Sequence, residues 1–265
     1  MSMDLSGRVA VVTGASRGVG FHIAQRLALG GAHVGLVARS ADALRLVQRE
    51  LHTRGAVAEA LPADCSRPDE VERLKRAVEQ VLGRPAILVN AAGAFGPLQS
   101  IRDSNVDAWI QTLLVNTIAP YLTCRAFVGG MIDAGWGRIV NVSSAAALAP
   151  PGPLNSAYAT SKGALNQFTR HLAAGLAGAG VTANVIHPGE VKTAMWADIR
   201  DQAIGLGVAG EGLRRWAAWV EATGGDPPAK AAELVFQLMR EEAAGINGQF
   251  LWIADGLKPP MPSWS

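Results

Sequence analysis

The chain alternates short apolar runs with longer amphipathic stretches, and this alternation limits the folds that it can adopt. Residues 9–13 (Val-Ala-Val-Val-Thr) form a β-branched run that ends at a cluster of glycines. An apolar run without polar alternation is typical of a strand that is buried on both faces. Comparable runs, each expected to be a strand, lie at residues 33–38, 57–62, 86–89, 138–142, 181–186 and 249–253.

Segments with apolar residues at helical spacing separate these strands. The first runs from Val19 to Leu29 and stops at two glycines, and the last begins at Asp226-Pro227, where a capping carboxylate precedes a proline. The others are expected at residues 41–51, 68–82, 106–131 and 156–176. Crossovers of this length require parallel strands with helices on both faces. We therefore predict an α/β protein with a Rossmann-type, doubly wound parallel sheet of about seven strands, in a single domain that spans residues 1–265.

Composition excludes several classes of protein. A hydrophobic fraction of 49% and a charged fraction of 17% allow a sizeable core. Lys+Arg 24 against Asp+Glu 22 leaves a net charge of +2 without a basic run, so no nucleic-acid or membrane surface is expected. Two cysteines, Cys65 and Cys124, are too few for a disulfide framework, and no metal site is expected. Without a membrane-length apolar run or a signal-peptide core, the sequence predicts a cytoplasmic protein.

A glycine-rich turn joins the first expected strand to the first expected helix, in the run Thr13-Gly14-Ala15-Ser16-Arg17-Gly18-Val19-Gly20. Ligands of doubly wound sheets bind at the carboxyl ends of the strands. Glycines there allow a pyrophosphate to approach the backbone, and the helix N-terminus offers N–H donors. The turn therefore favours a nucleotide site, although its spacing, Gly-x-x-x-Gly-x-Gly, differs from the commoner Gly-x-Gly-x-x-Gly.

The end of the second expected strand bears on the choice of nucleotide. An NAD-preferring site places an acidic residue there, whereas this chain has Ala38-Arg39-Ser40. Arg39 and Arg17 are suited to bind a 2′-phosphate, which predicts NADP(H) as the cofactor. The alternative is that both arginines are solvated surface residues.

Two further groups of polar residues follow later strands. Tyr158 and Lys162 are four residues apart on an expected helix, so they share a face, and an adjacent ammonium lowers the pKa of a phenol. Ser144 precedes them, after the strand at 138–142. Such a set suits general acid catalysis on a carbonyl oxygen, whereas Tyr-x-x-x-Lys alone also occurs on solvated helix faces. Asn90-Ala91-Ala92-Gly93 follows the fourth strand, and Asn116 lies among apolar residues, where it needs partners or bends its helix.

As an ordered set these residues resemble the short-chain dehydrogenase/reductase family over nearly the whole chain, and in particular its 3-oxoacyl-thioester reductases. The resemblance implies that Tyr158 exchanges the proton on the substrate oxygen, that Ser144 orients this oxygen, and that Lys162 binds the nicotinamide ribose and lowers the pKa of Tyr158. It implies that Asn116 holds a water that links Lys162 to solvent. It assigns cofactor binding to Gly14, Ser16, Arg17, Gly18, Val19, Gly20, Arg39, Ser40, Asp64, Cys65, Asn90, Ala91, Ala92, Gly93, Lys162, Pro188, Gly189, Val191 and Thr193.

Three features depart from the family pattern. The interval from Ser144 to Tyr158 is one residue longer than usual, which leaves Ser143 as an alternative. Glu190 puts a carboxylate where the family usually has an apolar or small residue. The end of the chain, at about 255–265, is a tail that contains proline and tryptophan.

The sequence thus predicts an NADP(H)-dependent oxidoreductase that acts on a ketone or secondary alcohol, with Tyr158 as the general acid or base. The alternatives are an NAD(H)-preferring dehydrogenase, a lyase or epimerase with a permanently bound cofactor, and a non-catalytic nucleotide sensor. The long connection at about 195–223 contains Trp196, Trp216 and Trp219 and is expected to be a substrate lid or a packing face. Trp216 and Trp219 should share one helix face. We also expect a homo-oligomer, a dimer or tetramer.

Overall fold

Seven parallel strands form one sheet in the computed structural model, which describes residues 4–258. Their order is β3-β2-β1-β4-β5-β6-β7, and every neighbouring pair is parallel. This confirms the predicted doubly wound α/β fold. The strands are β1 (Val9–Thr13), β2 (His33–Ala38), β3 (Ala58–Pro62), β4 (Pro85–Asn90), β5 (Gly137–Val142), β6 (Val181–His187) and β7 (Phe250–Trp252).

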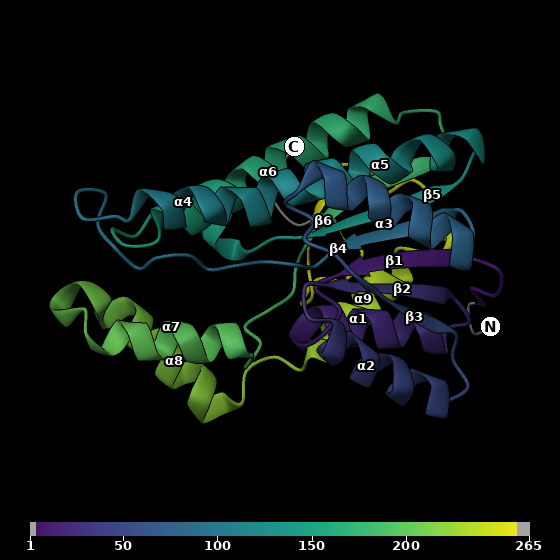
Figure 1. Cartoon of the computed structure of the whole chain (residues 1–265). Helices are drawn as coiled ribbons and strands as arrows, with labels where there is room; N and C mark the ends of the chain where they lie inside the picture. The colour runs from purple at the N-terminus through teal and green to yellow at the C-terminus, as the bar shows by residue number, and fades with distance from the viewer. Residues whose placement is uncertain (1–3, 259–265) are drawn as a thin grey trace.

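Helices cover both faces of this sheet (Figure 1). One face carries α1 (Gly18–Leu29), α2 (Ala41–Thr53) and α9 (Pro228–Gln237). The other carries α3 (Pro68–Val81), α4 (Val106–Leu113), α5 (Ala119–Asp133) and α6 (Ser156–Gly175). The remaining pair, α7 (Ala194–Ile204) and α8 (Glu211–Thr223), projects away from the sheet on the left of Figure 1. Single turns of 3₁₀ helix lie at Ala145–Ala147, Gly207–Gly210 and Glu241–Ala243.

The apolar runs form strands because both of their faces are buried. Along β1, Ala10 and Val12 join the core beneath α1 and α9, whereas Val9 and Val11 join the core on the opposite face. Successive side chains of a strand point to opposite faces, so a strand between two helical layers must be apolar at every position. The prediction that residues 9–13 form a strand buried on both faces is therefore confirmed.

The strand order reverses direction at β1, and the candidate site lies at the carboxyl end of this strand. β1 pairs with β2 on one side and with β4 on the other, so that Thr13 lies beside both Val37 and Asn90. The Thr13 hydroxyl oxygen accepts hydrogen bonds from the backbone N–H groups of Ala91 and Ala92, each at 3.2 Å. The loops after β1 and β4 are thereby joined at the crevice where such sheets bind ligands.

The helix expected over residues 106–131 is interrupted in its middle. A π-helical turn, Leu114–Ile118, separates α4 from α5, and the helical stretch continues to Asp133. Apolar periodicity does not reveal such a turn, because one extra residue is inserted without breaking the helix. Turns of this kind occur frequently at functional sites, and this one contains Asn116.

The predicted cap of the last helix is wrong. α9 begins at Pro228, and Asp226 does not cap it. The Asp226 carboxylate instead accepts a hydrogen bond from the Glu190 backbone N–H at 3.1 Å and pairs with Lys230 at 3.1 Å. The Asp226 carboxylate therefore binds the loop after β6 and not the first turn of α9. Local sequence does not indicate this long-range contact.

The segment at 195–223 is largely helical, and its tryptophans Trp216 and Trp219 lie in different environments. Trp216 packs with Leu98, Leu154 and Ile199 in a small apolar cluster, whereas Trp219 is 51% exposed. The two side chains lie three residues apart on α8, and their sharing of one helix face stays a prediction. Of the predicted tail, residues 259–265 lie outside the described part of the chain.

The contact between α1 and α9 suggests a test of the core. Phe236 is 2% exposed, and the guanidinium of Arg26 lies 3.2 Å from its ring centroid. Phe236→Ala is expected to lower the free energy of unfolding by about 3–5 kcal/mol in urea denaturation, since it leaves a cavity in the core. Val208→Ala, at a position that is 87% exposed, should change it by less than about 0.5 kcal/mol. Equal effects would contradict this packing.

Candidate active site

Tyr158 and Lys162 lie together on the buried face of α6. Tyr158 is 8% exposed and Lys162 is 4% exposed, and the Lys162 Nζ lies 5.8 Å from the centroid of the Tyr158 ring. The ammonium donates a hydrogen bond to the carbonyl oxygen of Val142, at the end of β5, at 2.8 Å. The pair therefore does not belong to a solvated helix face, which was the alternative interpretation.

Ser144, and not Ser143, is the serine that the structure brings to the phenol. The Ser144 side chain hydrogen-bonds to the Tyr158 side chain, and its oxygen also accepts from the Ala146 N–H at 3.2 Å. Ser143 is 3% exposed, and its hydroxyl has no partner among the described residues. The longer loop thus leaves Ser144 in contact with Tyr158.

Asn116 projects from the π-helical turn into a closed set of hydrogen bonds. Its side-chain oxygen accepts from the Ala94 N–H at 2.9 Å, and its amide donates to the Ala94 carbonyl at 2.8 Å and to the Ser161 hydroxyl at 2.9 Å. A Cβ built on Gly93 would lie 3.5 Å from the Asn116 oxygen and 3.8 Å from the Lys162 Nζ. Asn116 therefore joins the loop after β4 to α6 beside the lysine.

Burial is the largest cause of the pKa shifts of Tyr158 and Lys162. It raises the pKa of Tyr158 to about 12, a hydrogen bond from Ser144 acts to lower it, and the charge of Glu190 raises it further. Burial also lowers the pKa of Lys162 to about 8. The sequence predicts a lowered phenol pKa, and the structure differs because desolvation of the phenolate outweighs the hydrogen bond from Ser144.

The glycine turn after β1 has the shape of a phosphate cradle. Gly14 and Gly18 have φ angles of 69° and 59°, which glycine adopts without strain. A Cβ on Gly14 would meet the Ala92 nitrogen at 2.7 Å, and one on Gly20 would meet the Gly14 oxygen at 2.3 Å. No side chain caps the N-terminus of α1, so its N–H groups remain directed at the turn. This arrangement fits a dinucleotide pyrophosphate.

Two exposed arginines flank this cradle. Arg17 lies at its N-cap position and Arg39 directly follows β2, and neither forms an ion pair within residues 4–258. Burial acts to raise the pKa of Asp64, but hydrogen bonds from Ser66 and the charge of Arg39 outweigh it and lower that pKa. Arg39 thus lies near Asp64, another of the expected cofactor residues. Ser40 caps α2 by accepting from the Ala43 N–H at 3.3 Å.

Two of the expected cofactor residues have side chains that face inward. The Asn90 amide donates to the Asn141 oxygen at 2.9 Å, and its own oxygen accepts from the Thr123 hydroxyl at 2.8 Å. Cys65 is buried, which raises the pKa of its thiol to about 12. Only the backbone of these residues is then available to a ligand.

The loop after β6 lies against the glycine turn. A Cβ on Gly18 would lie 3.5 Å from the Thr193 side chain, and Thr193 caps α7 by accepting from the Trp196 N–H at 3.3 Å. Gly189 has a φ of 81°, and a Cβ there would meet Ile253 at 2.3 Å. Val191 forms an antiparallel bridge with Gly225. Pro188–Thr193 is therefore held rigidly beside the cradle.

Sequence reasoning missed an apolar wall beside the phenol. The ring of Phe95 lies 4.5 Å from that of Tyr158, and Phe95 packs in one cluster with Met195 and Trp216. No periodicity marks Phe95, which lies in an irregular loop. Its only signal is its position shortly after Gly93.

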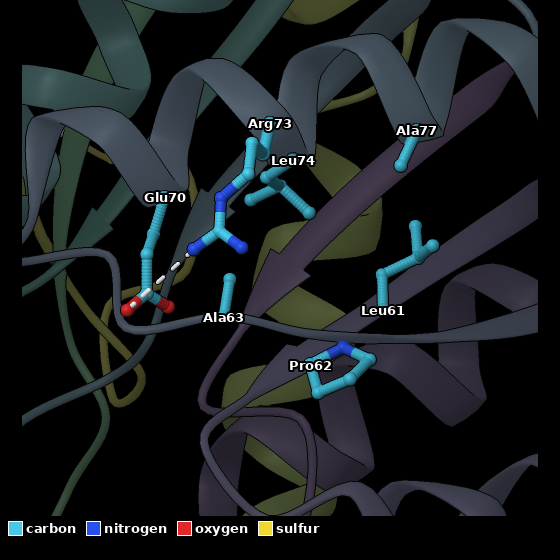
Figure 2. A pocket seen from close by; sticks show the side chains of 7 residues that line it. All are labelled: Leu61, Pro62, Ala63, Glu70, Arg73, Leu74 and Ala77. Carbon is cyan, nitrogen blue, oxygen red and sulfur yellow. Dashed lines mark ion pairs between the residues drawn. The ribbon is translucent and has the colours of Figure 1, made fainter.

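Two surface hollows of the described residues lie away from this site. One, of about 140 Å³, lies between the end of β3 and α3, where Arg73 and Glu70 form an ion pair at 3.8 Å (Figure 2). A second, of about 260 Å³, is lined by residues at the start of β6, the opposite end from His187. Neither contains a catalytic candidate. Within residues 4–258, no group of three or more His, Cys, Asp or Glu side chains is arranged to hold a metal, and none of the helices there combines the length and apolarity needed to cross a bilayer.

Comparison with known proteins agrees with this geometry. The model of the short chain dehydrogenase family matches residues 8–204. A short chain dehydrogenase of Pseudocercospora fijiensis is 37% identical over 196 residues, which cover 73% of this chain but only 63% of that protein. A 3-oxoacyl-[acyl-carrier-protein] reductase of Pseudomonas aeruginosa is 36% identical over 194 residues, 73% of this chain and 77% of that protein.

A solved structure extends the likeness to the whole chain. A variant of actinorhodin polyketide ketoreductase with NADPH superposes with a TM-score of 0.86 at 31% identity, covering 97% of this chain and 99% of the other. The fold, the ordered motifs and these relatives agree. The chain therefore belongs to the short-chain dehydrogenase/reductase family, oxidoreductases that act on carbonyl and alcohol substrates with a nicotinamide cofactor.

Proposed function

We propose that this protein reduces a ketone, or oxidises the corresponding secondary alcohol, with NADP(H), and that Tyr158 is its general acid or base. The observation that carries the proposal is the joint burial of Tyr158, its partner Ser144 and Lys162 at the edge of the sheet that also holds the glycine cradle. An intact set of this kind favours a catalyst over a nucleotide sensor.

The residues have distinct roles in this proposal. Tyr158, whose raised pKa keeps it protonated at neutral pH, donates a proton to the carbonyl oxygen during reduction. Ser144 donates a second hydrogen bond to the same oxygen, and the Lys162 ammonium stabilises the negative charge that develops there. Asn116 holds the loop after β4 in place against α6. When bound, the nicotinamide supplies or accepts the hydride.

The cofactor assignment rests on charge at the open end of the cradle. The pyrophosphate binds at the N-terminus of α1, and Thr193 with Pro188–Val191 positions the nicotinamide. Arg39 and Arg17 bind the 2′-phosphate of NADP(H), since a guanidinium pairs with a phosphate through charge-assisted hydrogen bonds. The likeness to a ketoreductase with NADPH supports this assignment. An NAD(H)-preferring dehydrogenase is the alternative.

The segment at 195–223 acts as an apolar lid over the nicotinamide in this proposal. Its residues Met195 and Trp216 pack with Phe95, which itself contacts Tyr158. A wall of this kind excludes water and favours bulky hydrophobic or aromatic ketones.

We further propose a homo-oligomer, a dimer or tetramer, in the cytoplasm. Large apolar side chains remain exposed along α4 and α5, among them Val106 at 66%, Ile110 at 48% and Tyr121 at 45%. Exposed apolar side chains of this size favour association with another chain. The free, buried thiols of Cys65 and Cys124 support a reducing compartment.

Removing the phenol hydroxyl tests the mechanism. Tyr158→Phe is expected to lower kcat by about 10²–10⁴ while NADPH still binds, because only the proton donor is lost. Oxidation of an alcohol by the wild-type enzyme should accelerate as the pH rises, since that direction needs the deprotonated phenol, whose pKa lies near 12. Steady-state rates at the nicotinamide absorbance band measure both. Near-normal turnover by the variant would refute the role of Tyr158.

Removing one guanidinium tests the cofactor choice. Arg39→Ala should weaken NADPH binding by about tenfold or more and leave NADH almost unchanged, because a charge-assisted bond to phosphate contributes about 1.5–3 kcal/mol. Arg45→Ala is the matched control, since Arg45 lies on α2 and pairs with Asp42 at 2.7 Å. Fluorescence titration with each cofactor measures the affinities. Equal losses for both cofactors would show that Arg39 binds no phosphate.

A further inference from the structure

Glu190 is a partly buried carboxylate on the loop beside the reaction centre. It follows Gly189 in the loop after β6, and a third of its side chain (33%) is exposed. Its backbone is held on both sides: the Glu190 N–H donates to Asp226 at 3.1 Å, and its carbonyl accepts from the Asp226 N–H at 2.9 Å. The backbone of Glu190 is therefore held at both its N–H and its carbonyl group.

One oxygen of this carboxylate is fixed by the helix pair above it. The Trp216 indole N–H, on α8, donates to Glu190 Oε2 at 2.8 Å. Trp216 is itself packed in the apolar cluster with Phe95 and Met195, the same cluster whose Phe95 ring lies against Tyr158. Trp216 thus orients the carboxylate and belongs to the apolar wall at the same time.

The other oxygen faces a neutral histidine without bonding to it closely. His187 Nε2 lies 3.7 Å from Glu190 Oε1, beyond the usual length of a hydrogen bond. His187 Nδ1 accepts from the Ala145 N–H at 3.3 Å, so Nε2 carries the ring proton. Burial lowers the pKa of His187 to about 4, although Asp226 acts to raise it, so the ring is uncharged. Oε1 therefore keeps lone pairs for another donor.

These contacts connect Glu190 to the catalytic groups through His187. Ala145, which His187 binds, directly follows Ser144, and Ser144 hydrogen-bonds to Tyr158. The negative charge of Glu190 also raises the pKa of the Tyr158 phenol. When the carbonyl oxygen of a substrate binds to Tyr158 and Ser144, the groups next to that carbonyl therefore experience the negative charge of Glu190.

We propose that Glu190 determines substrate specificity: its Oε1 accepts a hydrogen bond from a hydroxyl group carried next to the reacting carbonyl, so that the enzyme selects hydroxyketones over plain ketones and rejects oxo acids. This inference rests on the proposed function of the site. A hydroxyl supplies the donor that Oε1 lacks, and in a partly desolvated site such a bond to a charged acceptor is strong. The carboxylate of an oxo acid would instead meet the like charge of Glu190.

Three aromatic ketones with one common ring test the proposal. They are phenacyl alcohol, which carries the hydroxyl, acetophenone, which lacks it, and phenylglyoxylate, which carries a carboxylate instead. We expect Glu190→Ala to lower the ratio of kcat/KM for phenacyl alcohol to that for acetophenone by about tenfold or more, mainly through KM. The ratio for phenylglyoxylate to acetophenone should rise. Glu190→Gln, which keeps the size and one acceptor oxygen, should lower the first ratio less than Glu190→Ala does.

A second pair of variants separates recognition from general damage to the helix pair. Trp216→Phe keeps an aromatic ring but removes the N–H that orients Glu190, and should lower the phenacyl alcohol to acetophenone ratio. Trp219→Phe, on the same helix at a 51% exposed position, should leave this ratio as it is. Melting curves of all four variants establish that each is folded.

The outcomes distinguish a failure of the role of Glu190 from a failure of the proposed function. Ratios that do not change in Glu190→Ala, or a wild-type enzyme that reduces acetophenone but not phenacyl alcohol, would overturn the role of Glu190 alone. A wild-type enzyme that reduces none of the three ketones with either cofactor would overturn the proposed function as well. A fall in the first ratio together with a rise in the second supports the proposal.

Discussion

A parallel sheet brings the carboxyl ends of all its strands to one edge, and the whole candidate site follows from that constraint. The loops after β1, β4, β5 and β6 supply the glycine cradle, Gly93, Ser144 and Glu190. Contacts between these loops then fix the geometry: Thr13 binds the loop after β4, and Asn116 joins that loop to α6. Residues that are far apart in the chain meet because the strands are parallel.

Burial and charge oppose each other at this edge. The site withdraws a phenol, an ammonium and a carboxylate from water, and desolvation moves each pKa toward the neutral form: up for Tyr158 and Glu190, and down for Lys162. The protein reduces the cost with short bonds, such as that from Lys162 to the Val142 carbonyl. A phenol with a raised pKa is a proton donor at neutral pH, which suits reduction of a carbonyl.

Most of the fold could be predicted from local pattern, and the parts that could not depend on distant contacts. The run at 9–13 identifies a buried strand by itself, and the spacing of Tyr158 and Lys162 places both on one face of α6. The π-helical turn around Asn116 and the recruitment of Asp226 by Glu190 depend on neighbours far along the chain. The raised pKa of Tyr158 likewise depends on burial, which spacing alone does not show.

The ionisation of Tyr158 tests the balance of burial and charge most directly. The chain has two tyrosines, so Tyr121→Phe leaves Tyr158 as the single phenol. Carbon NMR of ring-labelled tyrosine, followed against pH, then reads its ionisation without interference. We predict that the phenol of the free protein stays protonated well above pH 10, in line with a pKa of about 12, and that adding NADP⁺ lowers this pKa. Ionisation near pH 10 in the free protein, or a pKa unaffected by NADP⁺, would contradict it.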